Sequence, residues 1–225
     1  MGYAILAKNV SINYGQNKVI SSASFTIDEQ DFVCIVGANG SGKSTLVKAI
    51  LGLIKLNSGR IMFGDNIKRE SIGFLPQDVK TDLNFPATVF EIVLSGTLGR
   101  LGIKAFYRKE DKIKAEEALR QLGVLKLKNA SFSDLSGGQK QKVLLARALA
   151  ATSKVLILDE PSNNLDYRSR KEFYEALKKL NKAGLTVVMI THDLDADDLI
   201  GNKIISIKET KVECLLMSDF LRSYR

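Results

Sequence analysis

Apolar residues alternate with polar ones, or gather in short blocks, over the first quarter of the chain. From Tyr3 to Val36 this pattern is typical of β-strands separated by turns. The block Phe32–Val36 is almost entirely apolar and stops at Gly37, as expected of a buried parallel strand. Lys43–Ile54 then carries apolar residues at mixed three- and four-residue spacing, which predicts a helix. A buried strand is therefore expected to lead through a glycine-rich turn into a helix.

The rest of the chain alternates between strand-like and helical periods. Helical spacing dominates Thr88–Gly123 and returns after Gly137. The other expected elements are strands at Arg60–Phe63, Ser71–Leu75, Lys154–Leu158 and Leu185–Ile190, a helix at Arg168–Leu180, a short acidic helix after Ile190, and two strands near the end. This alternation predicts an α/β fold with a mainly parallel sheet and helices on both faces.

Composition fits a globular protein, and charge adds one asymmetry. With 225 residues, 45% of them hydrophobic, the chain can bury a substantial core. Its longest apolar runs fall short of the roughly 18 residues that cross a bilayer. The formal charge of +8 suits a nucleotide, a nucleic acid or an anionic membrane surface. Nine Lys or Arg against four Asp or Glu lie between Arg100 and Lys128, where a solvated helical face is the simplest explanation.

Cysteine and histidine usage excludes two kinds of site. Cys34 and Cys214 lie far apart in the sequence, which predicts reduced thiols and no disulfide framework. His192 is the only histidine, so a zinc site built by the protein is not expected. The first residues lack the features of a signal peptide, and we expect a cytoplasmic protein.

Residues 37–45 read GANGSGKST and fit the phosphate-loop pattern G-x-x-x-x-G-K-[ST]. The glycines let successive amide groups point at phosphate oxygens, and the start of the next helix adds about half a positive charge. Lys43 would reach the β- and γ-phosphates, and the Ser44 hydroxyl would ligate Mg²⁺. A flexible linker is the alternative, but it would not join a buried strand to an amphipathic helix. The predicted nucleotide contacts are Gly37, Ala38, Asn39, Gly40, Ser41, Gly42, Lys43, Ser44 and Thr45.

Acidic residues end another apolar strand, at Asp159 and Glu160. A core strand that reaches solvent at an acidic turn would look the same. Ligands of α/β proteins, however, collect at the carboxyl ends of parallel strands. Beside a phosphate loop, Asp159 could hold Mg²⁺ through its water shell, and Glu160 could orient or deprotonate the attacking water.

Three further side chains lie near predicted strand ends. His192 follows an apolar strand and is a candidate γ-phosphate contact, although a lone histidine is more often structural. Tyr14 precedes Gly15 and could stack on adenine, or could be a core aromatic residue. Gln77 follows Pro76 at a strand end, where a surface glutamine is equally compatible with the sequence.

A second glycine-rich motif lies well downstream, and it resembles one family closely. GANGSGKST, FLPQ, LSGGQ, VLILDEP, SNNLD and THD follow one another as in the ATP-binding cassette (ABC) ATPases, over about residues 3–215. The resemblance implies a single cassette at 1–225, with an N-terminal antiparallel β subdomain and a helical subdomain inserted at about 86–150. It also implies a head-to-tail dimer that binds ATP and Mg²⁺. There the signature residues of one subunit close over the ATP of the other: Leu135, Ser136, Gly137, Gly138 and Gln139.

The same resemblance assigns a role to each remaining candidate. Tyr14 is similar to the adenine-stacking aromatic residue and Asp166 to the aspartate of the dimer contact. Glu160 is similar to the catalytic base and His192 to the switch histidine that acts with it. Magnesium contacts would come from Ser44, Gln77 and Asp159, and Gln77 would also couple hydrolysis to a partner.

Such a cassette resembles the motor subunit of a transporter, on the cytoplasmic face of the membrane. The resemblance implies separate permease chains, an extracytoplasmic substrate-binding protein and no nucleic acid partner. The stretch Phe85–Gly96 is similar to importers of divalent metals, zinc or manganese. The basic segment 100–128 would then lie near the permease or lipid headgroups. A soluble cassette of iron–sulfur cluster assembly, or another non-transport cassette, is the alternative function.

Overall fold

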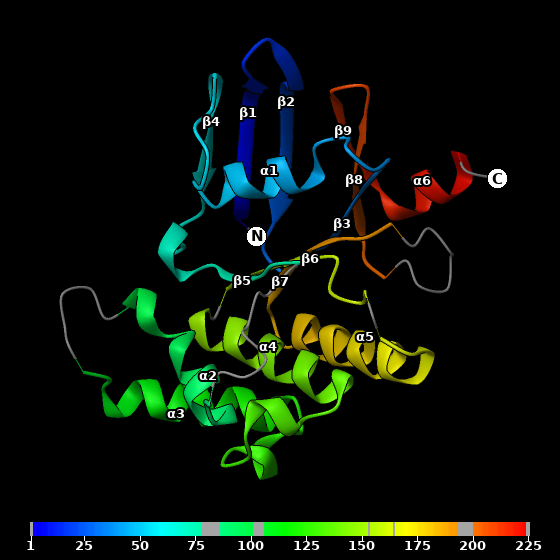
Figure 1. The fold of residues 1–225 in the computed structure, drawn as a ribbon. Coiled ribbons are helices and arrows are strands. Elements are labelled where there is room, and N and C mark those ends of the chain that lie inside the picture. The colour runs from blue at the N-terminus through cyan, green and yellow to red at the C-terminus, as the bar shows by residue number, and fades with distance from the viewer. Residues whose placement is uncertain are drawn as a thin grey trace.

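The computed structural model describes residues 2–77, 86–100, 106–152, 154–163, 165–192 and 200–223 (Figure 1). Parts of several sequence predictions lie outside these residues: the acidic helix after Ile190, Asp193 of the THD motif, Asn164 of the SNNLD motif, residues 101–105 of the basic segment, and Phe85 at the start of the metal-importer stretch. Among the described residues, no helix has the length and apolarity needed to cross a membrane.

A six-stranded sheet forms the centre of the molecule. Its strands lie in the order β5 (Gly73–Leu75), β6 (Val155–Asp159), β7 (Thr186–Ile190), β3 (Phe32–Gly37), β8 (Lys203–Lys208) and β9 (Lys211–Leu216). Every neighbouring pair is parallel except β8 and β9, which form an antiparallel hairpin. The carboxyl ends of β3, β6 and β7 therefore meet at one edge, and this edge carries the phosphate loop and the two acids.

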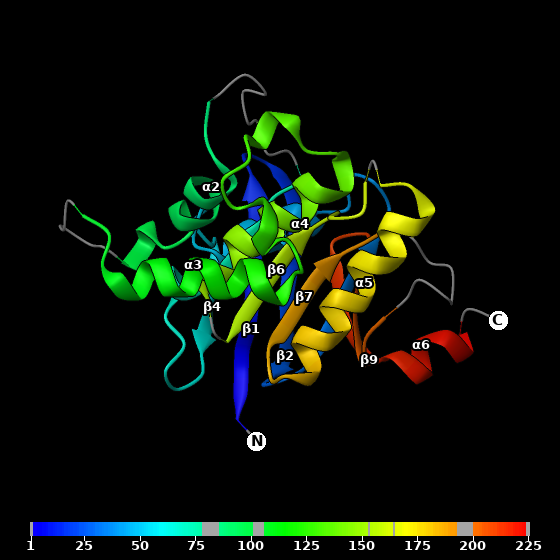
Figure 2. The same ribbon diagram turned by 90° about the horizontal axis from the view of Figure 1, so that it is seen from below.

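Both faces of this sheet are covered, which explains why its central strands are apolar throughout. In β3, Cys34 and Val36 pack toward one core cluster, whereas Val33 and Ile35 pack toward the other. The first cluster includes residues of the helices α2 (Val89–Ser95), α3 (Lys109–Gln121), α4 (Gly137–Ala151) and α5 (Tyr167–Lys182). Figure 2 shows α4 and α5 crossing this face of the sheet.

The opposite face is covered by one helix and a second sheet. Helix α1 (Lys43–Ile50) contributes to this core together with the antiparallel strands β1 (Tyr3–Tyr14), β2 (Asn17–Asp28) and β4 (Ser58–Phe63). The three strands are ordered β2-β1-β4 and lie at the top of Figure 1, with helices α2–α5 at the bottom. The predicted α/β fold, with a mainly parallel sheet, an N-terminal antiparallel sheet and helices on both faces, is confirmed.

Two details differ from the sequence prediction. Helix α1 ends at Ile50, four residues early, because Leu51 caps it and Gly52 turns the chain with φ 71°. A seven-residue helix, α6 (Met217–Ser223), follows the last strand and was not predicted. Short 3-10 turns lie at Arg69–Ser71, Leu98–Arg100, Leu125–Leu127 and Phe132–Asp134.

The basic segment 100–128 is partly neutralised by its own acids. Arg120 pairs with Glu117, and Lys128 Nζ lies 3.0 Å from the Glu116 carboxylate. These exposed pairs each contribute at most about 1 kcal/mol to stability. They support the solvated helical face expected for residues 109–128, while residues 101–105 lie outside the described residues.

Candidate nucleotide-binding site

The loop between β3 and α1 has a backbone that favours glycine. Gly37, Gly40 and Gly42 have φ values of 155°, 78° and 103°. A Cβ on Gly37 would lie only 2.5 Å from the Ile207 carbonyl oxygen, so even alanine would force the loop and β8 apart. Gly37 and Gly42 are therefore favoured both by conformation and by close packing, and Gly40 by conformation.

Polar groups of this loop point inward. Lys43 is only 6% exposed, and its Nζ donates to the carbonyl oxygens of Gly37 at 2.9 Å and Ala38 at 3.1 Å. Among the described residues, the Ser41 hydroxyl is buried and has no hydrogen-bond partner. A buried cation and an unsatisfied hydroxyl, both within a loop of exposed amides, fit a ligand that is anionic and rich in oxygen.

A cavity of about 470 Å³ joins this loop to residues from three other parts of the chain. Its lining contains the ring of Tyr14, the loop and first helical turn, Gln77, and Glu160. Tyr14 is 52% exposed, so the alternative of a buried core aromatic residue is wrong. The residues lining the cavity are Tyr14, Val19, Asn39, Gly40, Gly42, Lys43, Ser44, Thr45, Gln77 and Glu160. An apolar ring at one end and phosphate-binding groups at the other match the two ends of a nucleotide.

Two oxygen donors meet beside the phosphate loop. The Ser44 hydroxyl, in the first turn of α1, donates to Asp159 Oδ1 at 3.3 Å, and Asp159 is the last residue of β6. Burial of Asp159 raises the pKa of its carboxyl group, opposed by the hydrogen bond from Ser44. A hydroxyl and a carboxylate side by side are the hard oxygen donors that Mg²⁺ prefers.

Glu160 is held by amide side chains from two directions. Its Oε2 accepts hydrogen bonds from Gln77 Nε2 at 2.8 Å and from Asn163 Nδ2 at 2.7 Å. The sequence predicted Gln77 and Glu160 as site residues but missed Asn163. Asn163 lies within the SNNLD motif, yet nothing in the sequence showed that its amide turns back toward Glu160.

His192 reaches the same carboxylate from β7. Its Nδ1 lies 3.8 Å from Glu160 Oε2, and its side chain is 50% exposed. It also lines a second cavity, of about 590 Å³, together with Ala38 and Lys208. His192 therefore lies close to the carboxyl end of the neighbouring strand β6, as its place in the sequence predicted.

Signature residues lie elsewhere. Ser136 caps α4: its Oγ accepts from Gln139 N, and its own N–H donates to Gln139 Oε1 at 2.9 Å. Ser136 and Gly137 are exposed, and a Cβ on Gly138 would lie 2.8 Å from Ser169 Oγ of α5. Among the described residues, none of Leu135, Ser136, Gly137, Gly138 and Gln139 lines the cavity that holds Glu160. Within one chain the structure does not bring the two glycine-rich motifs together.

Asp166 is also outside that cavity. It is exposed and caps α5, where its carboxylate accepts hydrogen bonds from Ser169 N at 2.9 Å and Ser169 Oγ at 2.8 Å. These bonds lower the pKa of the Asp166 carboxyl group, the backbone N–H of Ser169 most of all. Asp166 therefore carries a negative charge on the surface at the start of α5.

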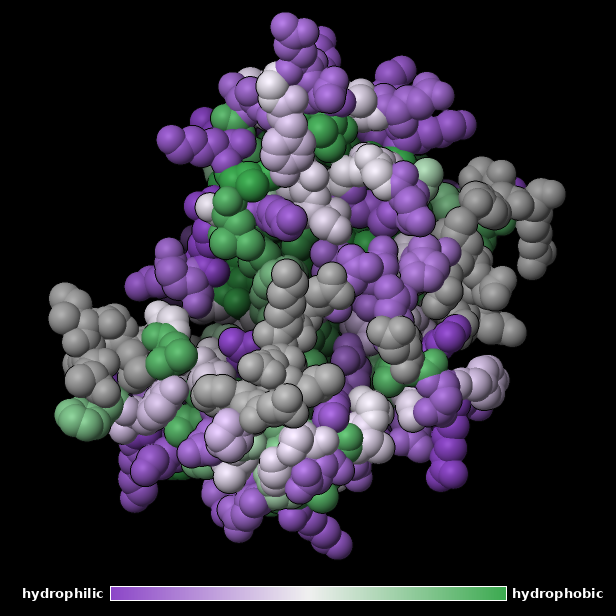
Figure 3. Space-filling view, viewed as in Figure 1, coloured by the Kyte–Doolittle hydropathy of each residue, from purple (hydrophilic) through white to green (hydrophobic). Residues whose placement is uncertain are grey.

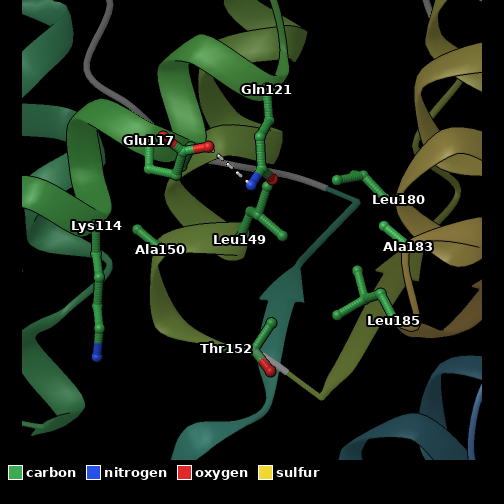
Figure 4. A pocket seen from close by; sticks show the side chains of 10 residues that line it. Lys114, Glu117, Gln121, Leu149, Ala150, Thr152, Leu180, Ala183 and Leu185 are labelled. Carbon is green, nitrogen blue, oxygen red and sulfur yellow. Dashed lines mark hydrogen bonds between the residues drawn. The ribbon is translucent and has the colours of Figure 1, made fainter.

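Another cavity, of about 350 Å³, lies between α3, α4 and α5 (Figure 4). Leu149, Leu180 and Leu185 give it an aliphatic wall, and Gln121 Nε2 donates to Glu117 Oε1 at 3.2 Å along its rim. It contains none of the predicted site residues, and we do not assign the nucleotide to it.

A phosphate loop between a parallel strand and a helix, with acids at the end of a neighbouring strand, defines a nucleoside triphosphatase of the phosphate-loop class. Comparison with known proteins then narrows the class. A family model described as "ABC transporter" matches residues 20–163. The chain belongs to the ABC transporter ATP-binding family.

Named relatives and solved structures agree with this family. A protein of Chlamydia muridarum named "Probable metal transport system ATP-binding protein" is 43% identical over 194 residues, which cover 84% of this chain and 82% of that protein. ZnuC of Bacillus subtilis, named a high-affinity zinc uptake system ATP-binding protein, is 37% identical over 206 residues, or 89% of each chain. The structure of cbiO1 from Clostridium perfringens, part of the ABC transporter complex cbiONQ, superimposes with a TM-score of 0.86 at 30% identity, covering 100% of this chain and 92% of that one.

Family membership confirms the resemblance drawn from the six sequence motifs. The chain binds ATP and hydrolyses it as the motor subunit of an ABC transporter that works with membrane permease subunits.

Proposed function

We propose that this chain energises uptake of a divalent metal ion, zinc or manganese, through separate permease subunits. The observation that carries the assignment of the site is the single cavity that joins Tyr14, the phosphate loop, Gln77 and Glu160. In it, Tyr14 stacks on adenine, while Lys43 and the loop amides hold the phosphates. Each end of ATP thereby meets the chemistry that recognises it.

Magnesium is the proposed metal of this site. Its oxygen donors would be Ser44, Asp159 and the side-chain amide of Gln77, and the first two are already in contact. When bound, Mg²⁺ would neutralise negative charge that develops on the phosphates during hydrolysis. Because Ser44 directly follows Lys43 in the chain, its hydroxyl lies beside the phosphates that Lys43 binds.

Hydrolysis is assigned to Glu160 and His192. Glu160 orients the attacking water and accepts its proton, while His192 contacts the γ-phosphate. Two observations support these roles: the carboxylate lines the nucleotide cavity, and His192 Nδ1 lies 3.8 Å from it. Gln77 donates a hydrogen bond to the same carboxylate and precedes the helical layer in the chain. It can therefore couple hydrolysis to a partner.

Replacing His192 with alanine is expected to impair hydrolysis more than binding. We expect kcat to fall about 10- to 100-fold, because one polar group that assists the reaction is lost. The dissociation constant for ATP should change by less than about threefold, because Lys43 and the loop amides remain. Steady-state ATPase assays and nucleotide titration of the same preparation measure both. An equal loss of binding and turnover, with a lowered unfolding temperature, would indicate a structural role instead.

The signature residues are proposed to act in trans. The residues that line the cavity include no arginine that could stabilise the transferred phosphoryl group. The exposed N-terminus of α4, with Ser136, Gly137 and Gly138, offers backbone N–H groups and a helix dipole that suit this task. A second copy would place them over the first copy's ATP, with Asp166 at the contact. We therefore propose a homodimer that closes on ATP.

Permease contact is assigned to the helical layer, which we treat as an inserted subdomain of about residues 86–150 in one cassette of 1–225. Figure 3 shows a largely polar surface on which apolar side chains gather between the antiparallel sheet and the helices. Exposed apolar residues of these parts include Leu53, Leu98 and Phe106. We place the chain on the cytoplasmic face of the membrane, where ATP is available, with an extracytoplasmic binding protein delivering the metal and no nucleic acid partner.

The relatives named for metal and zinc transport support the cargo. The test is affinity isolation of the tagged chain from detergent-solubilised membranes, identification of the companion chains, and reconstitution in proteoliposomes. We expect a polytopic permease to co-purify and ATP to drive uptake of zinc or manganese. Isolation with soluble assembly proteins, and no metal uptake, would favour the iron–sulfur cassette function instead.

A further inference from the structure

The segment that follows β6 folds into a turn around the Glu160 side chain. Glu160 has φ 48°, a left-handed conformation that is uncommon for a residue other than glycine. Its backbone carbonyl accepts a hydrogen bond from Asn163 N at 3.4 Å, which closes the turn. The same Asn163 donates through its side chain to Glu160 Oε2 at 2.7 Å. Asn163 thus fixes both the backbone and the carboxylate of the residue three positions before it.

Two amide groups share one oxygen of this carboxylate. Gln77 Nε2 and Asn163 Nδ2 both donate to Oε2, at 2.8 and 2.7 Å. Within the described part of the chain, Oε1 accepts no side-chain or backbone hydrogen bond. An ionised carboxylate only accepts hydrogen bonds, so two donors on Oε2 leave Oε1 as the oxygen available to a water molecule. The side chain of Glu160 is only 12% exposed, which limits other orientations.

The two donors differ in how firmly they are placed. Gln77 is exposed, and it follows the short edge strand β5. The turn around Asn163 is tied to two helices: Gln141 Nε2 of α4 donates to the Pro161 carbonyl at 2.5 Å, and Tyr174 OH of α5 donates to Ser162 Oγ at 2.9 Å. Ser162 is 6% exposed, so this second bond is buried. Asn163 is therefore held by the packed core, whereas Gln77 is free to turn to another ligand.

We propose that Asn163 is a positioning residue for ATP hydrolysis. By donating to Oε2 it keeps Oε1 of Glu160 directed at the attacking water, and it does so when Gln77 leaves the carboxylate for magnesium or for a partner. The inference rests on the proposed role of Glu160 as general base.

Charged groups around Glu160 come from several elements, and the test has to hold them constant. They are Asp159 beside it in sequence, His192 with Nδ1 at 3.8 Å, and Lys43, which lines the same cavity. Substitutions confined to position 163 leave all three in place. A change in kcat can then be assigned to the loss or reversal of the amide contact.

The experiment compares Asn163→Ala, Asn163→Asp and Glu160→Gln with the unchanged protein, with Asn129→Ala as the matched control at an exposed position. We expect Asn163→Ala to lower kcat about 10-fold with KM for ATP changed less than about threefold. In Asn163→Asp a carboxylate faces Glu160, so kcat should fall about 100-fold at neutral pH. Asn129→Ala should match the unchanged protein.

Each outcome separates this inference from the role on which it rests. If Glu160→Gln is inactive while both Asn163 variants keep the original kcat, the positioning role is wrong and Glu160 remains the base. If Glu160→Gln retains turnover, both assignments fall. A lowered kcat in the Asn163 variants with an equally impaired KM for ATP, accompanied by a lower unfolding temperature, would make Asn163 a structural residue and would also overturn the proposal.

Discussion

Replacing Glu160 with glutamine is expected to lower the ATPase rate at least about 100-fold, because a neutral amide cannot take the proton of the attacking water. The change is nearly isosteric. The new amide oxygen can accept the hydrogen bonds that Gln77 and Asn163 now donate to Oε2. The loop should therefore keep its shape, and the affinity for ATP should change by less than about threefold.

Single-turnover hydrolysis and equilibrium binding of ATP, measured on one preparation, test this expectation. Glu172→Gln is the matched control, because Glu172 is an exposed carboxylate on α5 that pairs with Lys142 away from the nucleotide cavity. Its turnover should stay close to that of the unchanged protein. Glu160→Gln with a rate within a factor of about three of that protein would show that another group serves as the base.

The second large effect is expected at Lys43. Replacing it with methionine keeps an unbranched aliphatic side chain but removes the amine, which now donates to loop carbonyls. The residue as a whole is only 6% exposed. Hydrogen bonds to charged groups contribute about 1.5–3 kcal/mol, so ATP should bind about 10- to 150-fold more weakly. ATPase activity at low ATP concentration should fall at least as far, because fewer sites are filled.

Lys48→Met is the control for Lys43→Met. Lys48 lies on the same helix and carries the same charge, but its side chain is exposed and does not line the nucleotide cavity. Fluorescent-nucleotide titration should show nearly normal affinity for this variant. Equal weakening by both substitutions would mean that Lys43 acts only through the net charge of α1 and makes no specific phosphate contact.

Much of the fold was predictable because its signals are local. The apolar blocks of β3, β6 and β7 fix buried parallel strands, and the glycines of the phosphate loop fix the turn that leaves the first of them. Periodicity misled at the end of α1, where Leu51 and Ile54 continue the helical spacing although Gly52 turns the chain between them. Both pack against the core while only partly buried, so their place in the pattern reflected contact with the core and not a longer helix.

Other features depend on contacts between distant residues, which one sequence does not reveal. Helix α6 is only seven residues long, and it is stabilised by burial of Met217 and Phe220 in the core beside β8 and β9. The contact of Asn163 with Glu160 requires a left-handed backbone at Glu160. The cavity itself requires Tyr14, Gln77 and Glu160 to meet from three separate segments, and only the resemblance to a family suggested that they would.

The central claim is that two copies of this chain complete each ATP site. Sedimentation equilibrium of the Glu160→Gln variant, with and without ATP and Mg²⁺, tests it most directly, because that variant should hold ATP without consuming it. We predict the 24.8 kDa chain mass without nucleotide and twice that mass with it. Adding Ser136→Arg, which places a bulky cation at the exposed start of α4, should restore the single-chain mass. The account would be contradicted if Glu160→Gln at saturating ATP kept the single-chain mass when alone and bound to its permease as one copy.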